Sequence, residues 1–283
     1  MTISPDNTPD KPEDARRGFL RLLGGAVACA GAAAVAVTAV TQAQAAATKP
    51  ADALPAIPNY DWTKHRWAFG VDATKCIGCL RCVEACKREN NVIEDAHHFR
   101  TWVERYVYLD GEERPHVDSQ SDPVNIAASG SEAEYRFANR YKDAKVDKAY
   151  FVPKLCNHCT HPSCVQVCPT GATYQTKDGV VVIDHKYCIG CQYCVQACPY
   201  GARYFNEEKG VTDKCTWCYH RITKGLKPAC VEVCPVGARV FGDLRDEESP
   251  VSLFIRNNRT RVLKPETGNA PNVYYVGLDK DVM

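Results

Sequence analysis

Nearly all the cysteines in this chain occur in four closely spaced quartets. Cys29 is the one singleton among the 17 cysteines. The quartets are Cys76, Cys79, Cys82 and Cys86; Cys156, Cys159, Cys164 and Cys168; Cys188, Cys191, Cys194 and Cys198; and Cys215, Cys218, Cys230 and Cys234. Three of them run into a similar tail: VCPTGATY, ACPYGARY and VCPVGARV. The chain therefore contains an internal repeat, and the repeated unit is a ligand motif.

The third quartet has the spacing with which bacterial ferredoxins hold two iron-sulfur clusters. From Cys188 to Pro199 the pattern is C-x2-C-x2-C-x3-C-P. In this pattern the first three thiolates hold one [4Fe-4S] cluster and the fourth serves a partner cluster. Because all four quartets are complete, we predict four [4Fe-4S] clusters held by the quartet cysteines.

Disulfides, zinc and haem explain the quartets less well. Cysteines three apart in tight loops are poorly placed to bridge one another, whereas this spacing lets a loop wrap around a metal cluster. Structural zinc sites use two separated pairs, and only the fourth quartet, with 11 residues between Cys218 and Cys230, would pass alone as one. Covalent haem attachment needs C-x-x-C-H, and neither Cys159 nor Cys218 is followed by histidine.

A loop, a short helix, a turn and a strand must position each set of thiols. In the third quartet, Cys198 is expected near the end of a short helix that Pro199 terminates. Gly201 can take the left-handed conformation that turns the chain, and the following ARYF is predicted to be a strand. Further strands are predicted at TWVERYVYL from Thr101 and NVYYVGL from Asn272. These elements predict an α+β fold assembled from ferredoxin halves.

The fourth cysteine of each quartet belongs to another cluster, so the pairing of quartets determines the ligand sets. Only 19 residues separate Cys168 from Cys188, which suits a compact unit made of the second and third quartets. The first and fourth quartets would then pair around this insert. Spacing alone also permits sequential pairing, first with second and third with fourth.

The N-terminus has the layout of an export signal. Arg16 and Arg17 precede an alanine-rich apolar run, an arrangement typical of a twin-arginine signal. We therefore expect residues 1–45 to direct export to the periplasm. The alternative is an uncleaved membrane anchor, because Leu22 to Val40 is uncharged, but its Ala and Gly content disfavours insertion.

The quartets between Trp67 and Gly242 resemble those of the four-cluster iron-sulfur subunits of dimethyl sulfoxide reductase, polysulfide reductase and formate-dependent nitrite reductase systems. The stretches CIGCLRCVEACKRENNV, KCTWCYHRITKGLKPACVEVC and KPETGNAPNVYYVG look most like the periplasmic iron-sulfur subunit of the Dsr membrane complexes of sulfur-metabolising bacteria. The resemblance implies nested pairing, with two ferredoxin-like double-cluster units.

The resemblance implies four ligand sets, which we name groups 1 to 4. They are group 1, Cys76, Cys79, Cys82 and Cys234; group 2, Cys86, Cys215, Cys218 and Cys230; group 3, Cys156, Cys159, Cys164 and Cys198; and group 4, Cys168, Cys188, Cys191 and Cys194. The implied domain, 46–283, consists of 75–90 paired with 210–245, an inserted ferredoxin unit at 150–205, an insertion at 98–148 and a docking tail at 246–283.

The expected function is electron transfer. A cluster with four cysteine ligands has no open coordination site, so it passes electrons without binding a substrate. No nucleophile motif or Gly-rich nucleotide loop is present, so we assign no catalytic residue and disfavour an enzyme such as an iron-sulfur hydrogenase.

Expected partners follow from the resemblance. They are a quinone-reactive integral membrane subunit, which would hold the chain at the membrane, and a cytochrome or catalytic redox subunit. The alternative is the iron-sulfur subunit of a periplasmic molybdopterin oxidoreductase or nitrite reductase system. The 35 basic and 34 acidic residues imply no nucleic-acid partner. Lys75, Lys154 and Lys214 lie just before quartets and either stabilise reduced clusters or are simply solvated.

Overall fold

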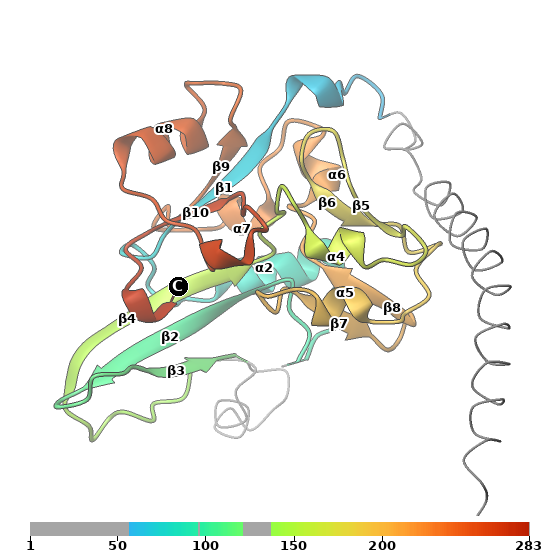
Figure 1. Ribbon diagram of the computed structural model, residues 1–283. Coiled ribbons are helices and arrows are strands. Elements are labelled where there is room, and N and C mark those ends of the chain that lie inside the picture. The colour runs from blue at the N-terminus through green and yellow to red at the C-terminus, as the bar shows by residue number, and fades with distance from the viewer. Residues whose placement is uncertain (1–56, 96, 121–136, 283) are drawn as a thin grey trace, which may run out of the picture. The chain divides into compact units, whose positions relative to one another are not determined.

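The computed structural model describes residues 57–95, 97–120 and 137–282 (Figure 1). The chain divides into two units, 1–49 and 50–283, and every described residue belongs to the second. The twin-arginine segment 1–45, with Cys29, lies outside the described residues, as does the polar stretch 121–136. Among the described residues no helix is both long and apolar enough to cross a membrane.

A three-stranded sheet forms the buried centre of the fold. Its middle strand, β1 (Trp67–Asp72), pairs in parallel with β10 (Val273–Val276) and antiparallel with β9 (Arg239–Asp243). Residues 68–72 of β1 are all buried. Helix α8 (Pro250–Asn257) packs so closely on this sheet that a Cβ at Gly70 would lie 2.7 Å from the Phe254 ring, so only glycine fits there.

A second sheet is built on the insertion after the first quartet. Strand β2 (Thr101–Leu109) pairs antiparallel with β3 (His116–Ser119) and with the long β4 (Val146–Leu155). The predicted strand TWVERYVYL is therefore confirmed. Cross-strand packing stabilises the pair, because the Tyr106 and Tyr150 rings stack 5.3 Å apart.

Two short hairpins follow the second and third quartets. One joins β5 (Thr173–Gln175) to β6 (Val181–Ile183), and the other joins β7 (Arg203–Asn206) to β8 (Val211–Lys214). In both hairpins the first strand begins just after a Gly-Ala pair of the repeated tail.

Four short helices carry five of the quartet cysteines, and a further helix begins just after Cys218. The helices are α2 (Arg81–Asn90), α4 (Ser163–Gln166), α5 (Tyr193–Gln196), α6 (Tyr219–Ile222) and α7 (Ala229–Glu232), with 3-10 turns η2 (Trp62–Lys64), η3 (Pro265–Thr267) and η4 (Lys280–Val282). The predicted sequence of helix, turn and strand is confirmed in the third quartet, where α5 ends before Cys198, Gly201 has φ 62° and β7 follows.

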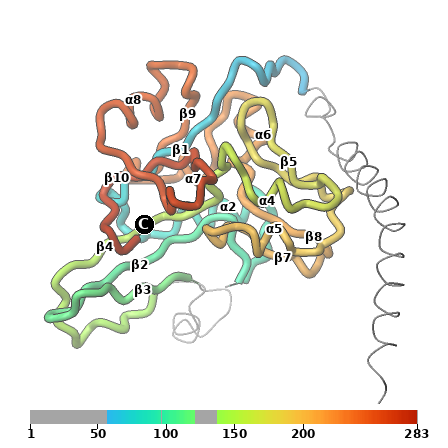
Figure 2. Tube along the Cα trace, in the orientation of Figure 1, coloured from blue at the N-terminus to red at the C-terminus, as the bar shows by residue number. Residues whose placement is uncertain are grey.

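Segments from opposite ends of the chain lie side by side. Helix α2, from the first quartet, contacts α7, from the fourth, and β10 joins the central sheet (Figure 2). The predicted strand at NVYYVGL is thus confirmed as β10, and its Val273 and Tyr275 are fully buried. These two side chains belong to the core, so any docking contact of the tail 246–283 must be made by its other residues. Helices and small separate sheets together make an α+β fold.

Candidate iron-sulfur centres

The cysteines of group 3 surround one hollow. Cys156, Cys159, Cys164 and Cys198 all line a cavity of about 320 Å³, part of which is open to solvent. Three of these come from the second quartet and the fourth comes from the third quartet. Helix α4 supplies Cys164, and the loop after α5 supplies Cys198.

Group 1 has an equivalent hollow. Cys76, Cys79, Cys82 and Cys234 line a hollow of about 330 Å³, part of which is open to solvent. Cys82 lies on α2 in the first quartet, whereas Cys234 follows α7 in the fourth. Cys79 is exposed to solvent, so one edge of this group reaches the surface.

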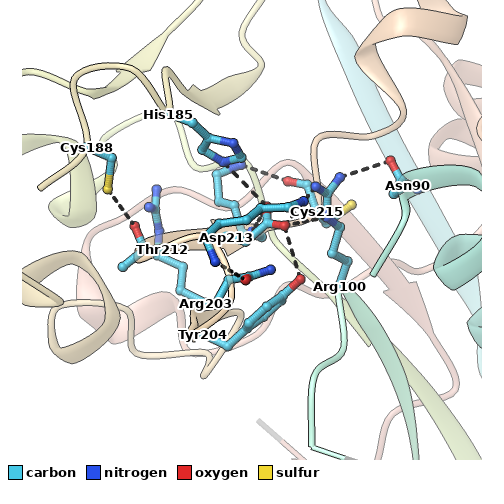
Figure 3. Close-up of polar contacts among 12 residues, drawn as sticks. Asn90, Arg100, His185, Cys188, Arg203, Tyr204, Thr212, Asp213 and Cys215 are labelled. Atoms are coloured by element: carbon cyan, nitrogen blue, oxygen red, sulfur yellow. Dashed lines mark hydrogen bonds and ion pairs between the residues drawn. The ribbon is translucent and has the colours of Figure 1, made fainter. Parts of the chain in front are cut away.

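Cys168, Cys188, Cys191 and Cys194 of group 4 line a third hollow of about 270 Å³, part of which is open to solvent. The Thr212 hydroxyl lies 3.6 Å from the Cys188 Sγ (Figure 3). It also lies 3.4 Å from the Cys194 Sγ, so it contacts two of the four sulfurs. Cys191 is exposed, as Cys79 is in group 1.

Group 2 lies in the interior, and all four of its cysteines are buried. The cysteines that interact electrostatically with Cys86 are Cys215, Cys230 and Cys218, in that order. Asn90 Nδ2 lies 3.6 Å from the Cys86 Sγ and 3.7 Å from the Cys218 Sγ. Arg100 orients this amide by donating to the Asn90 Oδ1 over 2.9 Å (Figure 3).

The structure thus brings the predicted cysteines together in nested order. Sequential pairing would place Cys86 with the second quartet, but its cysteine neighbours belong to the fourth. The series of groups is also continuous. Cys82 of group 1 interacts with Cys230 of group 2, and Cys215 of group 2 with Cys156 of group 3. Cys164 of group 3 and Cys194 of group 4 share a small apolar cluster with Val181.

Burial changes the acidity of these thiols. It raises the pKa of Cys76 to about 11 and those of Cys159 and Cys230 to about 12. Cys168 differs: burial acts to raise its pKa, but hydrogen bonds lower it, including one that the Thr173 N–H donates to its Sγ over 3.4 Å. Metal binding at Cys76, Cys159 and Cys230 therefore displaces a proton from each thiol.

The polar groups around the hollows fit a sulfur-rich cluster. The Arg203 Nε, the Asn157 Nδ2 and the Arg239 Nε and Nη1 are buried with no hydrogen-bond partner among the described residues. Arg203 and Asn157 line the group 3 hollow, and Arg239 lines the group 1 hollow. Buried donors normally have acceptors, and hydrogen bonds to cluster sulfurs are one way in which proteins tune such centres.

The spacing of the cysteines within each group bears on the size of the centre that they can hold. Within the described part of the chain, no three His, Cys, Asp or Glu side chains are grouped closely enough to hold a single metal ion. A structural zinc site needs four ligands around one ion. Cysteines that surround a hollow without meeting at a point fit the larger iron-sulfur cluster.

The three lysines near the quartets lie in different environments. Lys75 is 57% exposed and pairs with Asp72, and the Lys154 Nζ lies 2.6 Å from the Glu104 carboxylate. Lys214 alone is fully buried beside the cysteines. Sequence reasoning missed Arg203 and Arg239, although both occupy the same place in the repeated tail, after Gly-Ala.

The sequence comparisons identify the cluster type. Two matches to the 4Fe-4S dicluster domain cover residues 75–172 and 147–244. A tetrathionate reductase subunit of Archaeoglobus fulgidus is 46% identical over 75% of this chain and 83% of the relative. The corresponding tetrathionate reductase subunit of Salmonella typhimurium is 39% identical over 76% of this chain and 74% of its own. The Hdr-like menaquinol oxidoreductase iron-sulfur subunit 1 of Archaeoglobus fulgidus is 34% identical over 76% of this chain and 84% of its own length.

The two dicluster matches together span all four quartets. Two dicluster domains correspond to four [4Fe-4S] clusters, matching the cysteine content. The chain transfers electrons, because such clusters have no open coordination site. It therefore belongs to the family of [4Fe-4S] dicluster electron-transfer subunits that includes these tetrathionate reductase subunits.

Proposed function

We propose that groups 1 to 4 each hold one of the four clusters and that electrons cross the chain in the order of the groups, between two partner subunits. The observation that carries this proposal is the exposure pattern. Among the described cysteines only Cys79 of group 1 and Cys191 of group 4 are exposed. The groups at the two ends of the series are thus accessible to partners, while group 2 is enclosed.

Exposed apolar side chains support the same two contact sites. Ile77 is 58% exposed beside group 1. Ile189, beside group 4, is 66% exposed, and nearby Tyr193 is 58% exposed. Apolar side chains close to an electron-transfer centre suit a protein interface that excludes water.

One proposed partner is a quinone-reactive integral membrane subunit, and the other is a cytochrome or catalytic redox subunit in sulfur metabolism. The finer assignment is to the periplasmic subunit of the Dsr complexes, DsrO. Its support is the similarity of the quoted motifs and the relation to a menaquinol oxidoreductase subunit.

A second candidate partner is a molybdopterin-containing catalytic subunit. The higher identity to the Archaeoglobus fulgidus tetrathionate reductase subunit, 46% against 34%, favours it. Purification of the native complex distinguishes the two assignments. A membrane subunit with a cytochrome supports the Dsr-type assignment, whereas a stoichiometric molybdopterin subunit supports the second. In either case the isolated chain should accept electrons from a dye donor and turn over no substrate; substrate turnover by the isolated chain would contradict a purely electron-transferring role.

Export to the periplasm is a further part of the proposal. One ground is the pair Arg16 and Arg17. The other is the cluster content: clusters are inserted inside the cell before transport, so the protein needs an export route that accepts folded proteins. Replacing both arginines with lysine should keep the protein in the cytoplasm. Normal export of the double variant would show that another route is used.

A further inference from the structure

Arg203 lies between groups 3 and 4. Its side chain is buried, and its Nη2 donates a hydrogen bond to the Cys164 Sγ over 3.0 Å. Its Nη1 donates to the Thr173 hydroxyl over 3.2 Å. Its strongest electrostatic partners among the cysteines are Cys164 and Cys156 of group 3 and Cys194 of group 4. One guanidinium therefore interacts with both groups of the inner unit.

Arg239 has the equivalent position between groups 1 and 2. It is buried and lines the group 1 hollow, and its Nη2 donates to the Thr101 hydroxyl over 2.8 Å. Its cysteine partners are Cys82 and Cys76 of group 1 and Cys230 of group 2. In both units, then, the arginine follows Gly-Ala in the tail of one quartet and donates to a threonine that begins a strand after the paired quartet, β2 or β5.

Lys214 lies at the remaining junction, between groups 2 and 3. It is completely buried, and its Nζ donates to the carbonyl oxygens of Val181 and Cys215. Its cysteine partners are Cys156 and Cys164 of group 3 and Cys215 of group 2. Each junction in the series of groups therefore has one buried cation.

These three cations are not neutralised by the protein. Within the described residues none of them pairs with a carboxylate, in contrast to the buried Arg100, which binds Asp213 over 2.9 Å. An unpaired buried charge is strongly unfavourable. A cluster with four thiolate ligands is anionic and becomes more so on reduction, so the bound clusters are the counter-charges that these residues require.

The distribution of the cations follows the burial of the groups. Interior group 2 is next to Arg239 and Lys214, and group 3 is next to Lys214 and Arg203. Groups 1 and 4, each with an exposed cysteine, have one cation each. Burial opposes reduction, because the added negative charge loses contact with water. The most enclosed groups thus receive the most compensation.

We infer that Arg239, Lys214 and Arg203 each raise the reduction potentials of the two clusters between which they lie. Together the three residues reduce the differences in potential along the series of clusters. The inference rests on the proposed assignment of clusters to groups. It adds three positioning residues that are not ligands and whose effect is local to a junction.

The test is a redox titration of the full-length, anaerobically purified protein, followed by electron paramagnetic resonance. Signals are assigned with one Cys→Ser variant of each group. Arg203→Met should lower the equilibrium constants for reducing clusters 3 and 4 at least tenfold, about 59 mV for a one-electron couple. Clusters 1 and 2 should keep their potentials. Arg239→Met should instead shift clusters 1 and 2, and Lys214→Met clusters 2 and 3.

Matched variants separate charge from packing. Arg203→Lys and Arg239→Lys keep the positive charge, so the potentials of their clusters should stay close to the wild-type values. Thr173→Val removes only the hydroxyl that holds Arg203 and should shift clusters 3 and 4 in the same direction by less. Arg105→Met is the control, because that guanidinium is paired with Asp118 over 2.6 Å; it should shift none of the four potentials.

Iron content distinguishes the possible failures. Unchanged potentials in a fully loaded Arg203→Met protein, or an equal shift of all four clusters, would overturn the inference. If Arg203→Met does not take up its clusters, the test depends on Thr173→Val and Arg203→Lys. Potentials of clusters 3 and 4 that are the same in both variants as in the wild type would overturn the inference. A wrong assignment of clusters to groups shows up separately, in the cysteine variants.

Discussion

Asn90 Nδ2 lies 3.7 Å from the Sγ of Cys218, a residue 128 positions further along the chain. The same amide nitrogen lies 3.6 Å from the Cys86 Sγ. One side chain therefore contacts a cysteine of the first quartet and a cysteine of the fourth. This is the contact expected if the outer quartets share a cluster around the inner unit.

The nested ligand sets can be tested with pairs of serine substitutions. Cys86→Ser and Cys215→Ser remove ligands from the same group, so the double variant should lose no more than one cluster, about four irons per chain. Cys86→Ser with Cys156→Ser removes ligands from two groups and should cost about eight irons. Iron analysis and electron paramagnetic resonance of the full-length protein measure both.

The sequential arrangement predicts the reverse result for these pairs. It places Cys86 with Cys156, so that pair would cost one cluster and the pair with Cys215 would cost two. Cys168→Ser with Cys188→Ser serves as the matched comparison within the inner unit and should also remove a single cluster.

Total metal content tests the cluster type. Anaerobically purified protein should contain about sixteen irons and about sixteen acid-labile sulfides per chain, four clusters of four. Stoichiometric zinc would instead show that one quartet holds a different metal. The fourth quartet is the one to examine first, because its widely separated pairs resemble a zinc motif.

The buried pair of Arg100 and Asp213 should be important for stability. Asp213 also accepts a hydrogen bond from the Tyr204 hydroxyl over 3.1 Å. Asp213→Ala leaves Arg100 charged and buried, which costs about 3–5 kcal/mol. We expect the melting temperature of the loaded protein to fall by roughly 6–20 °C, taking 2–4 °C per kcal/mol.

An exposed ion pair provides the control for this change. Asp110 pairs with Lys145 over 2.6 Å, with side chains 51% and 77% exposed. Asp110→Ala should cost less than about 1 kcal/mol. Equal effects of the two aspartate substitutions on the melting temperature would show that the buried pair has no special role.

His98 should make stability depend on pH. Burial acts to lower its pKa, but hydrogen bonds and charge interactions with Asp95 and Glu207 raise it above its ordinary value. Protonated His98 therefore stabilises the fold at and below about pH 6.5, and this contribution is lost as pH rises through the raised pKa. His98→Ala should lower the melting temperature by about 1–4 °C at pH 6 and by less at pH 9.

The neighbouring His97 is exposed and serves as the control for the pH effect. His97→Ala keeps the backbone N–H that donates to the Asp95 carboxylate over 3.0 Å. Its melting temperature should follow that of the wild type at both pH values. A loss in His98→Ala that is equal at pH 6 and pH 9 would contradict the charge argument.

Local sequence was sufficient to predict the cluster type and several elements. Ligand spacing within a quartet is a property of one short loop, so it can be recognised without knowing the rest of the fold. The same is true of the turn at Gly201 and of the strand from Thr101, whose alternation and turn residues are local signals. Four clusters and an α+β fold followed from these signals.

Only the tertiary structure decided which residues meet across the chain. Lys75, Lys154 and Lys214 precede their quartets in similar ways, yet the first is solvated, the second pairs with Glu104 and the third is buried between two cysteine groups. The difference arises because β8 carries Lys214 inward, whereas β4 places Lys154 opposite Trp102 of β2, within reach of Glu104 two residues further along that strand. The meeting of Cys86 with the fourth quartet likewise depends on α2 packing against α7, a contact between distant segments that no local pattern encodes.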